Sequence, residues 1–194
     1  GKAGNADGQF NQPNDVVVGP DGSIYVADGH DAQGMTTANA VAEGLKRGAQ
    51  VIGGAPRYDS DEAGQIRRIF ELAREFDVDI DMHLDVGPTP DAMNIHLVRD
   101  LTEKYRRGGR VVVGHMAKLS LLPPQEVATL ARSLADTGIA VTVLPTTDLF
   151  LMGRNRDHSV VRGVADANLL LKHGVECSLS SNNILNPATP YGDC

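Results

Sequence analysis

Cysteine is scarce in this sequence, and so are signs of export or membrane insertion. The two cysteines, Cys177 and Cys194, are too few and too unevenly placed for a disulfide framework. No apolar run approaches the roughly 20 residues that a membrane span requires. Residues 1–7 lack the charged and then apolar pattern of a signal peptide. We therefore expect the protein to work in a reducing, cytoplasmic setting.

An excess of basic residues is also missing. Lys and Arg number 18 against 25 for Asp and Glu, which gives a formal net charge of −7 at pH 7. This balance argues against nucleic acid or an anionic membrane as a partner, because either would need a basic surface. The composition, 41% hydrophobic and 22% charged over 194 residues, is that of a globular protein with one domain or one domain and a small appendage. We therefore expect neither nucleic acid nor a membrane as a partner, and no feature indicates an oligomeric state.

Before about residue 40 the sequence predicts β structure without a helix. Two short runs rich in Val and Ile, residues 15–18 and 23–28, flank the turn-forming residues 19–22. This pattern predicts a β-hairpin, which must pack on something because an isolated hairpin is marginally stable in water. The small residues of 31–39 are typical of a linker. We therefore place a domain boundary between residues 39 and 40.

Residues 8–28 also resemble one NHL repeat, the unit that forms a blade of a β-propeller. The resembling segment extends over about residues 1–30. A propeller needs about four blades or more to close. The resemblance therefore implies a fragment of one propeller blade and not a complete propeller.

From residue 40 onward, apolar runs of strand length alternate with segments of helical periodicity. Strands that alternate with helices pair in parallel through βα units. The predicted strands are 50–54, 77–83, 110–115, 139–144 and 175–180, and the predicted helices are 61–76, 90–106, a segment after Pro124, and 164–173. We expect an α/β fold whose five parallel strands form an open sheet or the larger part of a (β/α)₈ barrel.

Three polar residues lie at or just past the C-terminal ends of separate predicted strands: His83, His115 and Asn182. In a (β/α)₈ barrel these strand ends form the rim of the active site, so the three side chains would converge there. Imidazoles in such an arrangement suit a divalent metal that activates water. Spacing alone also permits each histidine to be a hydrogen-bonded structural residue.

Residues 44–194 resemble the cytosine-deaminase-like branch of the amidohydrolase superfamily. The matching segments, in the order of that family, are Asp81-Met-His-Leu-Asp85, Gly109-Arg-Val-Val-Val-Gly-His115, Leu151-Met-Gly-Arg154, Arg162-Gly163, and Asn182-Asn-Ile-Leu-Asn-Pro187. The resemblance implies the second half of a TIM-like (β/α)₈ barrel, a divalent metal (zinc or iron), and hydrolysis of a C–N bond in a small cyclic amide or amidine.

The resemblance also assigns roles to individual residues. It implies His83, His115 and Asn182 as metal ligands. It gives His115, Asn182 and, as a substitute, Asp85 as catalytic residues, and it places Arg57 where the family contacts its substrate. Asp148 and Arg154, in the loop after the strand 139–144, are further candidates for lining a substrate pocket.

Three departures from the family's pattern weaken the catalytic prediction. No His-x-His pair of a first strand is present, Val86 stands where the deaminases have a catalytic glutamate, and Asn182 replaces an aspartate. An amide carries no charge and cannot relay a proton as a carboxylate does. Two functions therefore remain open: a metal-dependent hydrolase that is incomplete in this polypeptide, and a non-catalytic truncated barrel or binding module.

Overall fold

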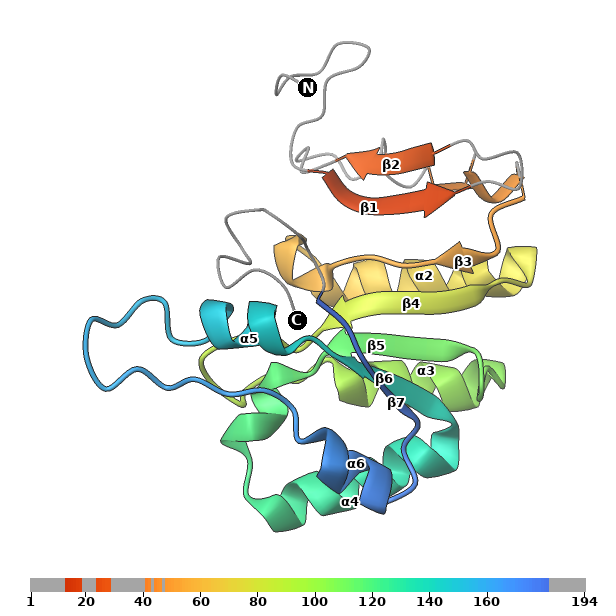
Figure 1. Cartoon of the computed structure of the whole chain (residues 1–194). Coiled ribbons are helices and arrows are strands. Elements are labelled where there is room, and N and C mark those ends of the chain that lie inside the picture. The colour runs from red at the N-terminus through yellow and green to blue at the C-terminus, as the bar shows by residue number, and fades with distance from the viewer. Residues whose placement is uncertain (1–12, 19–23, 29–40, 43, 47, 182–194) are drawn as a thin grey trace. The chain divides into compact units, whose positions relative to one another are not determined.

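The computed structural model describes residues 41, 42, 44–46 and 48–181, and the backbone alone of residues 13–18 and 24–28. Its strands form two sheets (Figure 1). The first sheet pairs β1 (Pro13–Val18) antiparallel with β2 (Ile24–Asp28). The second has five strands in chain order: β3 (Val51–Ile52), β4 (Asp79–Leu84), β5 (Val111–His115), β6 (Ile139–Val143) and β7 (Cys177–Leu179).

Chain-order strands with parallel pairing agree with the sequence prediction. The pairs β3–β4, β5–β6 and β6–β7 are parallel. This arrangement is consistent with part of a (β/α)₈ barrel, in which each strand neighbours the next along the chain. The turn between β1 and β2 and the side chains of both strands lie outside the described residues, so the structure does not support the propeller-blade interpretation. The predicted boundary at residues 39 and 40 also lies outside them.

The chain divides into two compact units, residues 1–82 and 83–194. In the first unit, helix α2 (Glu62–Phe76) packs against β3 and against the short helix η1 (Pro56–Tyr58). Its N-terminus is capped by Asp61, whose carboxylate accepts a hydrogen bond from the Gly64 amide at 2.8 Å. The helix buries one apolar face, made by Ile66, Ile69, Phe70, Leu72 and Ala73.

Helices of the second unit are α3 (Ile95–Tyr105), η2 (Ala117–Leu121), α4 (Pro124–Thr137), α5 (Pro145–Leu151) and α6 (Ala167–Lys172). Helix α4 contacts β6, α3 and α6. Alternation in β6 explains this packing, because Ile139, Val141 and Val143 are buried while Ala140 and Thr142 are only half-buried. On the half-buried face, the hydroxyl of Thr142 lies 2.8 Å from that of Ser178 on β7.

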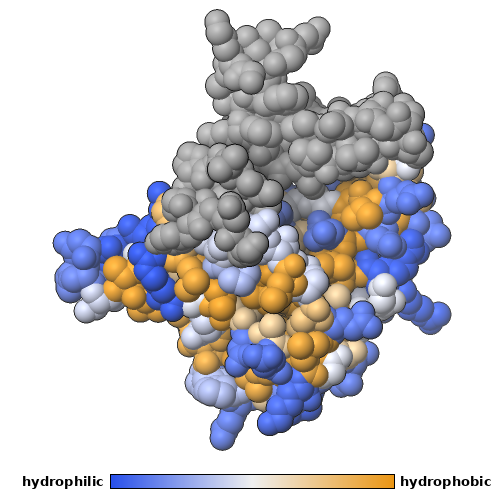
Figure 2. Space-filling view, viewed as in Figure 1, coloured by the Kyte–Doolittle hydropathy of each residue, from blue (hydrophilic) through white to orange (hydrophobic). Residues whose placement is uncertain are grey.

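Helix α5 corrects the sequence prediction for Asp148, which placed this residue in a loop after the strand 139–144. The helix begins at Pro145, where proline suits the first turn, and ends after Leu151. Residues 154–159, which follow it, are all exposed and mostly hydrophilic. They lie at the left of Figure 1, where Figure 2 shows a hydrophilic surface. No helix among the described residues has the length and apolar character needed to cross a bilayer.

Candidate functional site

Two histidines from neighbouring strands meet at the start of the second unit. His83 lies near the end of β4, and His115 is the last residue of β5. The Nδ1 atom of His83 is 2.8 Å from the Nε2 atom of His115. Their ring centroids are 4.9 Å apart, with the planes tilted by 44°. The sequence prediction that these strand ends bring the two histidines together is thus matched by the geometry.

The backbone at the end of β5 turns the His115 ring toward His83. Val111 and Val113 are buried, and strict alternation would place residue 115 on their side of the strand. His115 instead has φ 75° and Met116 has φ 54°, both in the left-handed region that non-glycine residues rarely adopt. These values interrupt the alternation, and His115 can then contact the exposed His83 while remaining 4% exposed itself.

A buried carboxylate holds the other side of the His115 ring. The Oδ1 atom of Asp148, on helix α5, is 2.6 Å from His115 Nδ1, and the Asp148 side chain is 0% exposed. Its second oxygen, Oδ2, has no hydrogen-bond partner among the described residues. Asp148, His115 and His83 therefore form a continuous chain of hydrogen-bonding groups that leads from the interior to the exposed His83. Asp148, which was a candidate for lining a substrate pocket, contacts His115 here and has no exposed surface.

The surroundings of His83 lower its pKa. Although the residue is exposed at the surface, its pKa is lowered from 6.5 to about 4, mainly because neighbouring atoms desolvate the ring and in smaller part because of the charge that His115 carries when protonated. His83 is consequently a neutral imidazole near pH 7. A neutral imidazole is the form that coordinates a metal.

Asp85, two residues beyond His83, caps a helix. It has φ 52° and is 5% exposed. Its two oxygens accept hydrogen bonds from the backbone amides of Asn94, at 2.8 Å, and Ile95, at 3.0 Å, in the first turn of α3. Burial raises the pKa of Asp85, although these bonds and the charge of Lys118 act in the opposite direction. Both carboxylate oxygens are thus already engaged by the backbone.

The remaining predicted site residues are Arg57, Arg154 and Asn182. Arg57 lies exposed in η1 of the first unit. Arg154 is exposed after α5, with its guanidinium carbon 4.4 Å from the centroid of the Phe150 ring. Asn182 lies outside the described residues. Within the range that the structure does describe, no group of three or more His, Cys, Asp or Glu could hold a metal ion.

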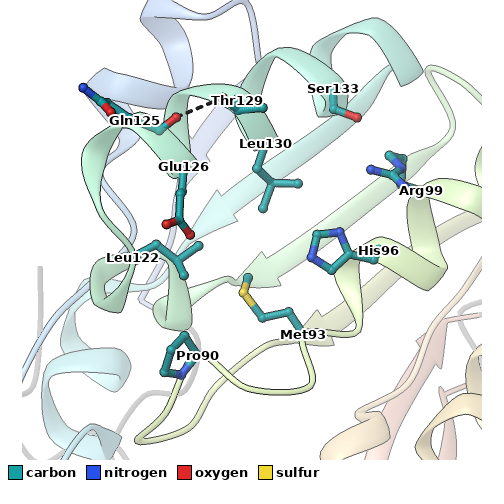
Figure 3. A pocket seen from close by; sticks show the side chains of 10 residues that line it. All are labelled: Pro90, Met93, His96, Arg99, Leu122, Gln125, Glu126, Thr129, Leu130 and Ser133. Carbon is teal, nitrogen blue, oxygen red and sulfur yellow. Dashed lines mark hydrogen bonds between the residues drawn. The ribbon is translucent and has the colours of Figure 1, made fainter.

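A separate hollow of about 550 Å³ lies between α3 and α4. Figure 3 shows His96 and Arg99 of α3 across from Glu126 and Leu130 of α4. Apolar side chains of Met93 and Leu122 complete part of its wall (the other lining residues are Pro90, Gln125, Thr129 and Ser133). None of the predicted site residues lines it, and its open walls are formed by helices and loops.

Comparison with known families agrees with this architecture. A model described as the amidohydrolase family matches residues 26–194, which is most of the chain. The chain therefore belongs to the amidohydrolase family. A model of the NHL repeat matches the short segment 10–33 and overlaps the start of the first match.

Individual relatives cover this chain well but are much longer. A pterin deaminase of Rhizobium rhizogenes is 25% identical over 160 residues, which are 82% of this chain and 35% of the relative. The crystal structure of 5-methylcytosine deaminase from Klebsiella pneumoniae with 5-fluorocytosine matches with a TM-score of 0.72 and 22% identity, over 79% of this chain and 38% of that one. N-isopropylammelide isopropylaminohydrolase from Burkholderia multivorans matches with a TM-score of 0.69 and 19% identity, over 95% and 40%.

These figures establish two facts. The likeness to the solved structures shows a shared fold. The chain spans between about a third and two fifths of the length of these relatives.

Proposed function

We propose that this chain carries part of the active site of a metal-dependent hydrolase that releases an amino group from a small nitrogen heterocycle. The observation that carries the proposal is the contact of His83 with His115 at the ends of adjacent strands, within a chain of the amidohydrolase family. The cytosine-deaminase-like branch is favoured because two of the similar proteins are named as deaminases of pterin and of 5-methylcytosine. Both compounds carry an amino group on a ring carbon that is bonded to ring nitrogen.

The donor chemistry fits one ligand of a divalent metal, zinc or iron. The imidazole of His83 has its Nδ1 engaged by His115, and its Nε2 makes no hydrogen bond to any described residue. A metal-binding histidine ordinarily has its second nitrogen held in this way. A complete site takes about three or four protein ligands, and further donors, Asn182 among them, are not within the described part of the chain. Such a metal, when bound, lowers the pKa of a coordinated water to near neutrality.

The side chains of this chain then take distinct roles. His83 would bind the metal through Nε2, and His115 would orient His83, since its own Nε2 faces that ring. In the proposed reaction, the oxygen of water forms a bond to the ring carbon, the amino nitrogen takes up the proton that the water loses, the bond from the carbon to that nitrogen breaks, and ammonia leaves. Arg154, which is exposed, remains a candidate for contact with the substrate, as does Arg57.

The first experiment measures zinc binding by the full chain in wild type and in H83A. We expect H83A to weaken binding at least tenfold, because a ligand is removed. Substitution of a solvent-exposed histidine on α3, in H96A, is the matched control and should leave the affinity unchanged. Equal affinities in all three proteins would overturn the assignment of His83.

The second experiment measures ammonia release from cytosine, isocytosine and pterin with added Zn²⁺ or Fe²⁺. We expect little turnover by this polypeptide, because it has no His-x-His pair and Val86 has no titratable group. Substantial turnover that disappears in H83A would show that the site is complete after all. The second candidate function, non-catalytic binding, is favoured by the lack of a three-ligand cluster among the described residues. It would be supported by tight binding of a heterocycle without metal and without release of ammonia.

A further inference from the structure

Burial of the Asp148 carboxylate costs free energy of folding in its present surroundings. It is 0% exposed on α5, and only one of its oxygens has a hydrogen-bond partner among the described residues. A buried carboxylate with an unpaired oxygen destabilises a fold, and such a group calls for an explanation other than packing. Its one contact, at 2.6 Å to His115 Nδ1, has the length of a charge-assisted hydrogen bond.

The direction of the hydrogen bonds follows from what each atom can do. When the Asp148 carboxylate is ionised, it accepts hydrogen bonds and donates none. His115 then carries a proton on Nδ1 and donates it to Asp148. In a neutral His115 ring, Nε2 is then an acceptor, and the proton of the 2.8 Å contact belongs to His83 Nδ1. The Nε2 atom of His83 is left with its lone pair.

We propose that Asp148 is a positioning residue, which acts through His115 to hold His83 as the tautomer protonated on Nδ1 and thereby presents Nε2 to a metal. This inference rests on the proposed function insofar as it makes His83 a metal ligand. Metal-binding histidines are commonly oriented by a carboxylate on their second nitrogen. Here an additional imidazole stands between the carboxylate and the ligand.

The first test needs no substitution and no metal. Long-range ¹H–¹⁵N correlation spectra of the metal-free full chain at pH 7.5 report which nitrogen of each imidazole is protonated. We expect His83 and His115 both to be protonated on Nδ1 and unprotonated on Nε2. If His83 is protonated on Nε2, His115 must be the donor in their contact, and the proposal is overturned.

The second test compares D148N with D157N. The amide in D148N keeps the shape of Asp148 but carries no charge, so it holds the proton on His115 Nδ1 less strongly. D157N is the matched control, because Asp157 also contacts the Nδ1 atom of a histidine, His158, but that pair is fully at the surface. We expect D148N to give mixed tautomers at His83 and His115 and a 10- to 100-fold weaker affinity for Zn²⁺. D157N should change neither.

The outcomes separate this inference from the proposed function. Unchanged tautomers and zinc affinity in folded D148N would overturn the role of Asp148. If D148N does not fold, H115A tests the same path at His115, because alanine offers no acceptor to His83 Nδ1 and should release the His83 tautomer. A fixed tautomer in a wild-type chain that binds no zinc would support the role of Asp148 in orienting the histidines and count against the metal assignment of His83.

Discussion

Replacement of Asp85 tests whether this carboxylate serves the fold or the chemistry. In D85A, the backbone amides of Asn94 and Ile95 lose their acceptors, and Ile95 is completely buried. Hydrogen bonds to a charged group contribute about 1.5–3 kcal/mol each, and loss of an N-cap costs about 0.5–2 kcal/mol. The raised pKa of Asp85 shows that its burial is itself unfavourable. We therefore expect a loss of about 2 kcal/mol, which is below the roughly 3 kcal/mol that two such bonds would contribute without this cost and at the upper end of the range for an N-cap.

The assay is urea unfolding of wild type, D85A and D85N, with amide hydrogen exchange at Asn94 and Ile95. D85N keeps one acceptor and should lose about 1 kcal/mol. The matched control is D166A, which removes the exposed cap of α6 (a 3.1 Å bond to the Leu169 amide) and should cost less than D85A. If D85A is no less stable than D166A and exchange at Asn94 and Ile95 is unchanged, the capping role is wrong. A catalytic role for Asp85 would then regain support.

Three further predictions concern other parts of the molecule. The pKa of His83 is about 4 in the folded chain against an ordinary value of 6.5, so between these pH values the unfolded chain binds a proton that the folded chain does not. Wild type should therefore lose stability on acidification from pH 6.5 to 4 more steeply than H83Q in unfolding measurements. G138A should destabilise more than G109A in the same measurement. Both positions have left-handed backbone, at φ 72° for Gly138 and 77° for Gly109, and this conformation costs an alanine about 1–2 kcal/mol at either position. The difference lies in the contacts: a Cβ at 138 would lie 2.8 Å from the Gly109 nitrogen, whereas one at 109 meets nothing within 4 Å. Burial raises the pKa of Cys177, so in C194S its alkylation at pH 8 should be slower than that of free cysteine and should accelerate only at higher pH.

Two parts of this structure were accessible from the sequence. Strands β3, β5 and β6 are rich in Val and Ile, and β4 alternates polar with apolar residues; such patterns leave few alternatives to β structure. The meeting of His83 with His115 followed from topology, because parallel strands in chain order place their carboxyl ends at one edge. No side-chain detail was needed for that inference.

The carboxylates near these histidines, Asp148 and Asp85, could not be placed from the sequence in the same way. Helix α5 has the sequence PTTDLFL, in which two threonines and an aspartate are poor helix formers, and only Pro145 marks its start. Burial of Asp148 depends on packing between segments distant in the chain. Asp85 could be placed only once its left-handed backbone was known, because the alternation rule applies within a strand and not beyond its end.

The left-handed backbone at His115 has a consequence for which amino acids this position can accept. At φ 75°, a β-branched residue is strongly disfavoured, whereas glycine is free of strain and asparagine is among the better tolerated side chains. In a saturation library scored for folding alone, Gly and Asn should therefore rank above Val and Ile at 115, even though the site is buried. The backbone thus restricts which amino acids position 115 accepts, independently of any functional requirement, and histidine is among those that it tolerates.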